Sequence, residues 1–468
     1  MTDTRKRLHE QALKFGATES LARFAIETKT SSVPSDVVHA ARRAILDTIG
    51  VALAGSVEPV SRIIADHARD QGGATESAIW GTSKRVGALN AALANGTSAH
   101  ALDFDDTHEA MRGHPSVPVL PAVIAMGERL GASGADVLAA FAIGVEVECK
   151  LGRLAGYEPY DRGWHVTATH GVVGATVAAG RLAGLSIDQM CQAIGVAVSH
   201  AGGVRQNFGT MTKPLHVGRA AGSAIFAVEL VQRGFSASPE ALEGDVGYLA
   251  VFGRSADYSV DDLSSTLGNP FELVSPGVNV KVYPCCAFTH AAIDLALELS
   301  GDLSKQAINR VVVSVPYAAP LVLIHHRPRD PLSAKFSLEY CVAAALVDNA
   351  VTLTHFIDPV VLRDDLQAVL RLVEYVVPEE WQAQCGPLKT GQARMDVHLD
   401  DGTVRHAETD AVRGSSARPL SDTELATKFL SCAELSLGLD QSEEVLELIR
   451  GFEQLPAVSE LTRRLVPS

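Results

Sequence analysis

The stretch HALDFDDTHEAMRGHP, residues 100–115, places three histidines and four carboxylates within sixteen residues. Imidazoles titrate near neutral pH and can move protons, while carboxylates can orient an imidazole or bind a cation. The stretch lacks the His-Glu-x-x-His spacing of metalloproteases, because His108-Glu109 is followed by Ala-Met-Arg. Three interpretations therefore remain open for this stretch alone: a metal site, a proton-transfer site, or a polar loop that faces water.

Three further segments place ionisable residues beside glycine or proline. They are GWHVTATHG with His165, RQNFGTMTKPLH with Lys213 and His216, and NVKVYPCCAFTH with Lys281. Loops held by a rigid scaffold are where catalytic groups concentrate. Each segment also has an ordinary structural explanation: a buried histidine, a surface lysine at a helix start, or adjacent cysteines that pack in the core.

The four segments together predict one site. They supply His114, His165, Lys213, His216 and Lys281, a mainly basic set in a chain of formal net charge −15. If these residues converge, they form a pocket for a compact polyanion. Histidines there can move protons, and lysines can hold carboxylates or stabilise an enediolate-like intermediate. Because lysines repel cations, we expect an acid–base site without a metal.

Other functional signatures are missing from the sequence. There is no Gly-x-Gly-x-x-Gly after a strand, no Gly-Lys-Ser/Thr phosphate loop and no Gly-x-Ser-x-Gly elbow. The net charge of −15 argues against sequence-independent binding of nucleic acid. Residues 1–16 lack the apolar core of a secretory signal, no apolar run could span a bilayer, and the seven cysteines show no Cys-x-x-Cys spacing. We expect a reduced cytoplasmic protein with no nucleic-acid or membrane partner.

Helical patterns position most of these segments. Apolar residues recur at helical spacing over four stretches, 34–55, 133–154, 186–203 and 216–235. Ser133 is a cap candidate, and Ser186 with Gln189 three residues later forms a capping-box pattern. The glycines and alanines of the fourth stretch suit close packing between helices.

The pattern changes after about residue 280. Residues 308–317 are β-branched and predict a strand, and 393–408 alternate around Asp401-Gly402, which predicts a hairpin. A helical pattern over 333–349 separates them, and Ser421 with Glu424 begins the last helical region. 

These patterns predict a mainly α protein with an inserted α+β domain. The large all-helical domain is expected to be discontinuous, comprising residues 1–280 and 420–468. The smaller α+β domain is expected over residues 281–419.

At the four segments the sequence resembles the MmgE/PrpD family. The strongest marks are HALDFDDTH with the following GHPS, GWHVTATHGVVGA, GTMTKPLHVG and KVYPCC, in that order. The resemblance extends from ARRAILDTIGVALAG to the C-terminal helices. It implies a helical domain and a smaller α+β domain, with the site in the cleft between them. It also implies a homodimer and a reaction that uses neither a metal nor an organic cofactor.

The resemblance also implies roles for individual residues. The expected catalytic residues are Asp103, His114, His165, Lys213 and Lys281. The expected substrate contacts are Thr107, Arg112 and His216. We expect Asp103 to orient and charge a histidine. Asp105, Asp106 and Glu109 are expected to be caps or solvated carboxylates, and His100 and His108 are left without a role.

The family includes 2-methylcitrate dehydratase, cis-aconitate decarboxylase and iminodisuccinate epimerase. We therefore expect a cofactor-independent lyase that abstracts a proton α to a carboxylate of a small di- or tricarboxylate, as a 2-methylcitrate dehydratase would. The main alternative is an epimerase, because MRGHPS, NFGTMTKP and YPCC look closest to epimerase-like bacterial members. A decarboxylase ranks lower, because LIHHRP has histidines where some decarboxylases carry a tyrosine before Arg-Pro. The remaining alternative is a non-catalytic carboxylate-binding protein.

Overall fold

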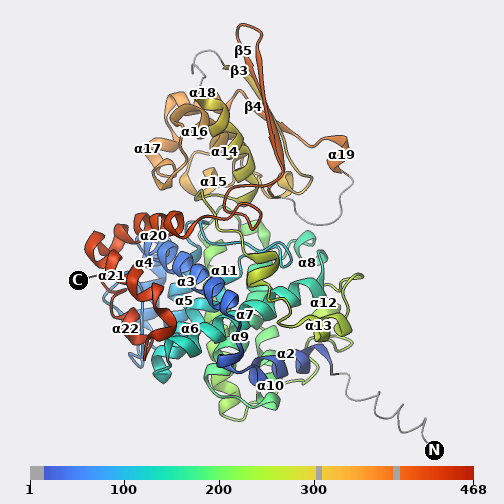
Figure 1. Ribbon diagram of the computed structural model, residues 1–468, viewed down its shortest axis with the longest axis vertical. Helices are drawn as coiled ribbons and strands as arrows, with labels where there is room; N and C mark the ends of the chain where they lie inside the picture. The colour runs from blue at the N-terminus through green and yellow to red at the C-terminus, as the bar shows by residue number, and fades with distance from the viewer. Residues whose placement is uncertain (1–14, 302–307, 383–389, 468) are drawn as a thin grey trace, which may run out of the picture.

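The computed structural model describes residues 15–301, 308–382 and 390–467. The chain is mainly helical and forms a larger helical domain with a smaller mixed domain stacked on one end (Figure 1). This confirms the predicted fold class. Residues 1–14 lie outside the described residues. They make up most of the N-terminal segment that was expected to lack a secretory signal.

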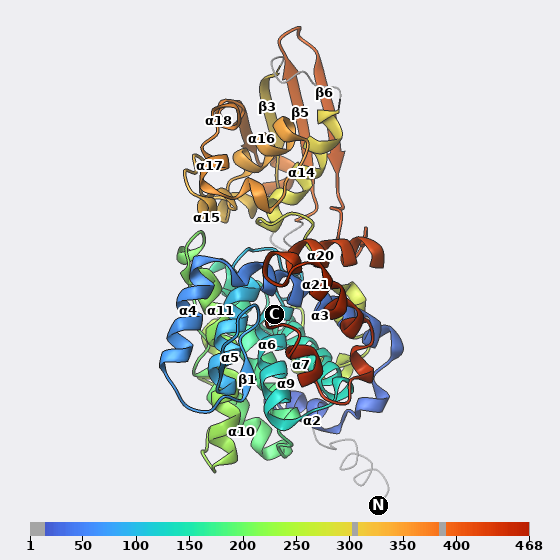
Figure 2. The same cartoon turned by 90° about the vertical axis from the view of Figure 1, so that its left-hand side faces the viewer.

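The larger domain is built first from the helices that precede residue 270. They are α2 (Ala17–Glu27), α3 (Ser35–Ser56), α4 (Pro59–Asp70), α5 (Ala88–His100), α6 (Ser116–Leu130), α7 (Gly134–Ala155), α8 (Glu158–Asp161), α9 (Val166–Leu182), α10 (Ile187–Val198), α11 (Thr212–Gln232), α12 (Tyr248–Phe252) and α13 (Val260–Thr266). The C-terminal helices α20 (Asp422–Leu437), α21 (Leu439–Arg450) and α22 (Ser459–Thr462) return to this domain, where they lie beside α3 and α6 (Figure 2). A short antiparallel pair, β1 (Ser77–Ala78) and β2 (Arg85–Val86), is an addition to the all-helical expectation.

Side-chain caps begin several of these helices where the sequence predicted them. The Ser133 side chain accepts a hydrogen bond from the backbone N–H of Asp136 at the start of α7. Ser186 with Gln189 forms a complete capping box at α10, and Ser421 with Glu424 forms another at α20. Each cap satisfies backbone donors that a helix cannot satisfy within itself.

Small residues let α5 and α11 approach closely. A Cβ atom at Gly218 of α11 would lie 2.2 Å from Thr97 Oγ1 and 2.3 Å from the Leu93 carbonyl oxygen, both on α5. The backbones therefore meet at a distance that no larger residue permits. This contact fixes α11, whose first turn carries Lys213, against the end of α5, which leads into residues 100–115.

Within the described ranges, no single helix combines the length and apolar character needed to cross a membrane. The helices α3 and α4 meet the criterion only as a pair, and an 88° bend separates them.

The smaller domain contains a four-stranded sheet in the order β4-β3-β5-β6. The strands β3 (Ile308–Ser314), β5 (Ala393–Leu399) and β6 (Val404–Thr409) are antiparallel neighbours, and β5 and β6 form the predicted hairpin. The fourth strand, β4 (Val373–Val376), pairs in parallel with β3 and was not predicted. The accompanying helices are α14 (Ala287–Ser300), α15 (Pro331–Ala334), α16 (Leu338–Asp348), α17 (Asp358–Val361), α18 (Asp364–Leu370) and α19 (Glu379–Gln382).

The helical pattern predicted over 333–349 is broken into two helices. The helix α15 ends at Ala334, and α16 begins at Leu338 after Ser337 caps it by accepting from the N–H of Tyr340. The break leaves Lys335 outside both helices. 

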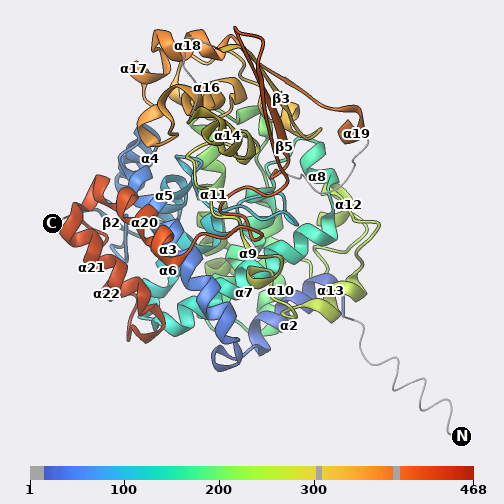
Figure 3. The same cartoon turned by 45° about the horizontal axis from the view of Figure 1, so that its top comes forward.

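The two domains meet over packed side chains. The aromatic residues Tyr160 and Phe208 of the larger domain belong to the same buried cluster as Phe288 and Phe336 of the smaller domain. In Figure 3 the smaller domain comes forward over the end of the helical domain. The loop between α5 and α6 reaches this junction.

Candidate active site

The loop between α5 and α6 has an irregular backbone and is hydrogen-bonded to a segment far along the chain. Asp103 and Arg112 have φ angles of +52° and +51°, in the left-handed region that side chains rarely adopt. The backbones of Thr107 and Asn279 exchange hydrogen bonds, with N···O distances of 2.9 and 2.8 Å. The loop is thus tied to the segment that carries Lys281.

Asp103 lies between two lysine ammonium groups. Lys213 Nζ donates a hydrogen bond to Asp103 Oδ1, and Lys281 Nζ lies 3.0 Å from Oδ2 and 2.8 Å from the Asp103 carbonyl oxygen. All three side chains are buried. Burial alone raises the pKa of Asp103, but the two ammonium groups outweigh it and hold that pKa well below its usual range. Burial lowers the pKa of Lys281, but the Asp103 carboxylate more than offsets this and raises it. Asp103 and Lys281 are therefore both ionised at neutral pH.

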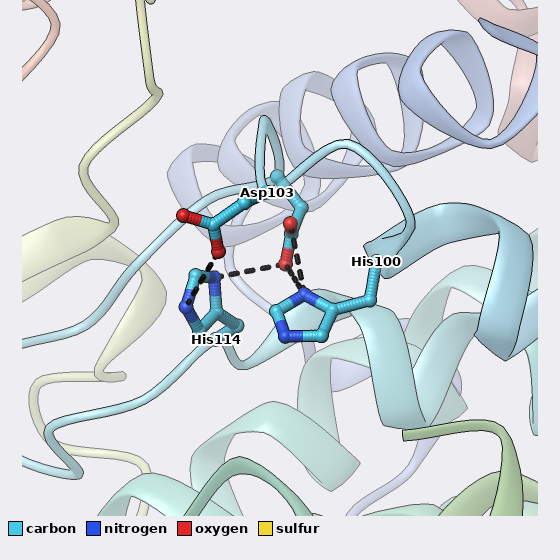
Figure 4. Close-up of side chains that lie close together, drawn as sticks. His100, Asp103 and His114 are labelled. Carbon is cyan, nitrogen blue, oxygen red and sulfur yellow. Dashed lines mark hydrogen bonds and ion pairs between the residues drawn. The ribbon is translucent and has the colours of Figure 1, made fainter. Parts of the chain in front are cut away.

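Asp105 is the carboxylate that contacts histidines. His100 donates a hydrogen bond from Nδ1 to Asp105 Oδ2 at 2.9 Å, and His114 Nδ1 lies 2.9 Å from the same oxygen. Figure 4 shows the side chains of His100 and His114 beside Asp103, whose Oδ1 is 3.8 Å from His114 Nε2. Asp103 was expected to orient a histidine; its shortest contacts are with the two lysines, and its contact with His114 is longer. Asp105 makes the shorter histidine contacts, fully buried, although it was predicted to be a cap or a solvated group.

The histidines of this cluster are held in the neutral form by their surroundings. Burial lowers the pKa of His100 to about 3, although the Asp105 carboxylate acts in the opposite direction. Burial also lowers the pKa of His114, against the same carboxylate. For Asp105, the two imidazoles outweigh burial and hold the pKa well below its usual range.

His165 precedes α9 and contacts two other histidines. Its ring stacks on His100 at a centroid distance of 5.6 Å, and its Nδ1 lies 3.1 Å from Nδ1 of His216. Burial is the largest cause that lowers the pKa of His165 well below its usual value, and the neighbouring His100 and Lys213 disfavour its protonation further. His165 is therefore a neutral imidazole before any anion binds.

Arg112 is anchored at the edge of the site. Its Nη1 pairs with Asp161 Oδ1 at 3.0 Å, its guanidinium carbon lies 3.7 Å above the Tyr157 ring, and Nη2 lies 3.5 Å from the Tyr317 hydroxyl. These contacts hold a planar cation in a fixed orientation, which suits recognition of a carboxylate.

One pocket joins these residues and contains about 600 Å³ of space, including the part that is open to solvent. Seven of the eight predicted site residues line it, namely Asp103, Thr107, Arg112, His114, His165, Lys213 and Lys281. His216 does not line the pocket and contacts it through His165. The smaller domain contributes apolar walls from Phe288, Val322 and Phe336. The pocket thus combines buried cations and imidazoles with apolar surfaces from both domains.

The sequence did not single out Lys335, which supports the pocket from the smaller domain. Its buried ammonium donates to the carbonyl oxygens of Leu102 at 2.8 Å and Pro284 at 2.9 Å. Burial lowers its pKa to about 8. Lys335 therefore ties the residue before Asp103 to the segment that follows Lys281. Its position inside a helical pattern gave no signal of this contact.

Of the other two acidic residues of the loop, Asp106 is buried and Glu109 is exposed. Asp106 is buried and accepts from the N–H of Ser116 at 3.2 Å and from its hydroxyl at 2.5 Å, so it caps α6 as expected although it is not solvated. Burial raises the pKa of Asp106 to about 8. Glu109 is exposed at the pocket, and His108 is buried with Nε2 3.3 Å from Glu272 Oε2.

Four side chains offer ligand atoms that lie close enough for a metal ion. One atom each from His100, Asp103, Asp105 and His114 falls within 4.8 Å of the others. Two lysine ammonium groups already neutralise Asp103, and they repel a cation. The donor set therefore suits an anionic ligand better, and the absence of a metal from the reaction stays a prediction.

The cysteines of the described residues are all buried. All six are buried and free, while Cys385 lies outside those residues. Cys286 lines the pocket, and burial raises the pKa of its thiol to about 12. At neutral pH this thiol is not a thiolate, which agrees with the expected packing role.

Comparisons with known proteins match nearly the whole chain. Residues 19–261 match the MmgE/PrpD N-terminal domain, and residues 283–454 match the MmgE/PrpD C-terminal domain. The chain is similar to cis-aconitate decarboxylase of Homo sapiens, with 31% identity over 466 residues that cover 96% of this chain and 94% of that protein. It is also similar to the cis-aconitate decarboxylases of Mus musculus, at 30% identity over 96% of this chain and 93% of that protein, and of Aspergillus terreus, at 27% over 97% and 96%. With both domain models matched in order, the chain belongs to the MmgE/PrpD family.

Proposed function

We propose that this protein is a lyase that decarboxylates a small tricarboxylate of the cis-aconitate type. The observation that supports this proposal most directly is the pocket that Lys213, Lys281, His114 and His165 line together. The proposal changes the order of the sequence-based expectations, which placed dehydration and epimerisation first. It does so because the relatives described above are cis-aconitate decarboxylases that match this chain over 93% or more of their length.

The charges of the pocket suit a substrate with several carboxylates. Lys213 and Lys281 both pair with Asp103 and line the pocket, so both can attract a second carboxylate. Arg112 adds an oriented guanidinium at the edge, and Thr107 adds a hydroxyl. The two lysines share one carboxylate, Asp103, and a multiply charged substrate would supply further negative charge to them.

Binding of such an anion changes the protonation of the histidines. Burial and neighbouring cations hold the pKa values of His114 and His165 low. Substrate carboxylates placed among them oppose both lysines and raise these pKa values. A histidine can then carry the proton that the reaction needs.

In the proposed reaction the bond between the α-carbon and one carboxylate breaks, and carbon dioxide leaves. The electron pair stays on the carbon and spreads into a neighbouring carboxylate, where the lysines stabilise the charge. His165 or His114 donates its ring N–H proton to the carbon, and water restores that proton after the product leaves.

Dehydration of a β-hydroxy tricarboxylate is the second candidate, and one observation favours it. The segment LIHHRP lacks the tyrosine found in some decarboxylases, and its His325 packs on Gly209 instead of lining the pocket. Here a histidine removes the α-proton while the hydroxyl leaves with a proton from a second group. The relatives named above lend no support to an epimerase.

The test is incubation of the full-length protein with cis-aconitate, citrate-type hydroxy acids and substituted succinates in D₂O, followed by ¹H and ¹³C NMR. We expect loss of a carboxyl carbon as carbon dioxide and a deuterated product. A new alkene with all carbons retained identifies the dehydratase, and a deuterated stereoisomer identifies an epimerase. Binding without any turnover or exchange would leave a carboxylate-binding protein and overturn both lyase proposals. Lys213→Met is the matched control for background reaction.

A homodimer and a cytoplasmic location also remain proposals. Light scattering after gel filtration measures the mass in solution and tests the dimer against the 49.4 kDa monomer.

A further inference from the structure

His216 stands behind His165 instead of in the pocket. The two Nδ1 atoms lie 3.1 Å apart, which is hydrogen-bond distance. His165 is 2% exposed and lines the pocket, whereas His216 is half-buried and keeps contact with solvent. A substrate ligand would be expected on the pocket wall, so this arrangement points to a different role for His216.

Gly203 fixes the two rings relative to each other. Its carbonyl oxygen accepts a hydrogen bond from the backbone N–H of His165 at 2.9 Å. A Cβ atom at Gly203 would lie 2.9 Å from Cγ and 3.0 Å from Nδ1 of His216, and its φ angle is +120°. Glycine is therefore required both by the backbone and by the His216 ring. The contact between the histidines is built into the fold at this position.

Only one proton can lie between two neutral imidazole nitrogens, so one Nδ1 donates and the other accepts. If His165 accepted, its own proton would sit on Nε2, a buried atom with no hydrogen-bond partner among the described residues. A buried N–H without an acceptor is costly. If His165 donates, His216 carries its proton on Nε2, on a ring that water can reach. The second arrangement leaves fewer donors unsatisfied.

We propose that His216 is a positioning residue that accepts the Nδ1–H of His165 and so presents Nε2 of His165 as the reacting nitrogen. The inference rests on the proposed function, because it assigns the proton transfer of that reaction to one atom. In dehydration, Nε2 takes the α-proton of the substrate and the C–H electron pair expels the β-hydroxyl. In decarboxylation, protonated Nε2 gives its proton to the carbon that has lost carbon dioxide. In both cases the Nδ1–H bond to His216 is kept and stabilises the imidazolium.

Two substitutions of His216 separate positioning from substrate binding. His216→Asn keeps an acceptor oxygen near the position of Nδ1, whereas His216→Phe keeps the ring volume without an acceptor. We expect His216→Phe to lower kcat at least tenfold with KM within twofold, and His216→Asn to recover most of kcat. Gly203→Ala should resemble His216→Phe because it displaces the ring. His200→Phe, at an exposed histidine outside the pocket, is the matched control.

A measurement that needs no turnover decides the same point. With ¹⁵N-labelled histidine, NMR of the wild-type protein should show neutral His165 protonated on Nδ1, and His216→Phe should shift the proton to Nε2. Wild-type His165 protonated on Nε2 would overturn the inference, as would a rise in KM with kcat unchanged in both His216 variants. If no acid in the panel is turned over while the tautomer result holds, the proposed function fails and the positioning role stands.

Discussion

Asp105 Oδ2 lies 2.9 Å from Nδ1 of His114, and the same oxygen accepts a hydrogen bond from His100. A buried carboxylate that contacts two imidazoles fixes their orientation and favours their protonated forms. His114 lines the pocket, so its orientation depends on a residue behind the pocket wall.

Replacing this carboxylate should therefore impair turnover more than binding. We expect Asp105→Asn to lower kcat at least tenfold, with KM changed less than threefold, in steady-state assays on the acid that the wild type turns over. The matched control is Asp106→Asn, because burial raises the pKa of Asp106 to about 8 and its carboxyl is already uncharged at neutral pH. If kcat falls equally in both variants, the loop is sensitive to any substitution of its carboxylates. That result would contradict a specific role for Asp105.

The buried carboxyl of Asp106 predicts a pH dependence of stability. Its pKa is raised from 3.8 to about 8 in the folded protein, so between these values the unfolded chain binds fewer protons. The free energy of unfolding therefore falls as pH rises through this window, by at most about 1.4 kcal/mol per pH unit from this group. Asp106→Asn removes the effect, and urea unfolding at pH 4 to 8 should show the variant gaining stability relative to the wild type. If the difference in the free energy of unfolding between the variant and the wild type stays constant from pH 4 to 8, the raised pKa of Asp106 is refuted.

Lys335 should matter for catalysis although it does not line the pocket. Lys335→Met removes the hydrogen bonds to the carbonyl groups of Leu102 and Pro284 and lets the Asp103 loop shift relative to Lys281. We expect kcat to fall at least tenfold, and the free energy of unfolding to fall by about 1–3 kcal/mol because two buried acceptors lose their donors. Lys84→Met, which removes an ion pair with Asp66 at the surface, is the control for loss of a lysine. Wild-type kinetics in a folded Lys335→Met protein would contradict this role.

The close approach of α5 and α11 predicts a stability effect far from the chemistry. Gly218→Ala places a methyl group against Thr97 and the Leu93 carbonyl, and should cost about 1–3 kcal/mol in the free energy of unfolding. Gly301→Ala is the control, because no atom of the described residues lies within 4 Å of its added Cβ atom. Chemical unfolding of the wild type and the two variants gives the comparison. An unchanged denaturant midpoint for Gly218→Ala would mean that α5 and α11 can move apart without loss of stability, which would contradict the prediction.

Regular elements were predictable because their signals are local. Capping patterns at Ser186 and Ser421 and the Asp401-Gly402 turn involve residues a few positions apart, and the structure contains each element. The strand β4 was missed because four residues give too little pattern, and the break before α16 was missed because Ser337 caps a helix inside an apolar run.

The membership of the pocket was predictable from motifs, but the partners inside it were not. In DFDD the spacing cannot tell which carboxylate meets a lysine and which a histidine, because the backbone at Asp103 is left-handed and follows no period. Lys335 reaches the site from more than two hundred residues away along the chain from Leu102, and no local pattern records that contact.

The return of the C-terminal helices to the larger domain has a consequence for protein synthesis. Lys428 of α20 donates to the carbonyl of Phe104, the residue that follows Asp103, and pairs with Asp47 of α3. The ribosome makes α3 early and α20 only after the whole smaller domain has emerged. A nascent chain in which α20 has not yet been made therefore carries every residue that lines the pocket but lacks the Lys428 contact to Phe104, so we expect the loop that carries Asp103 to be held less firmly until α20 has folded.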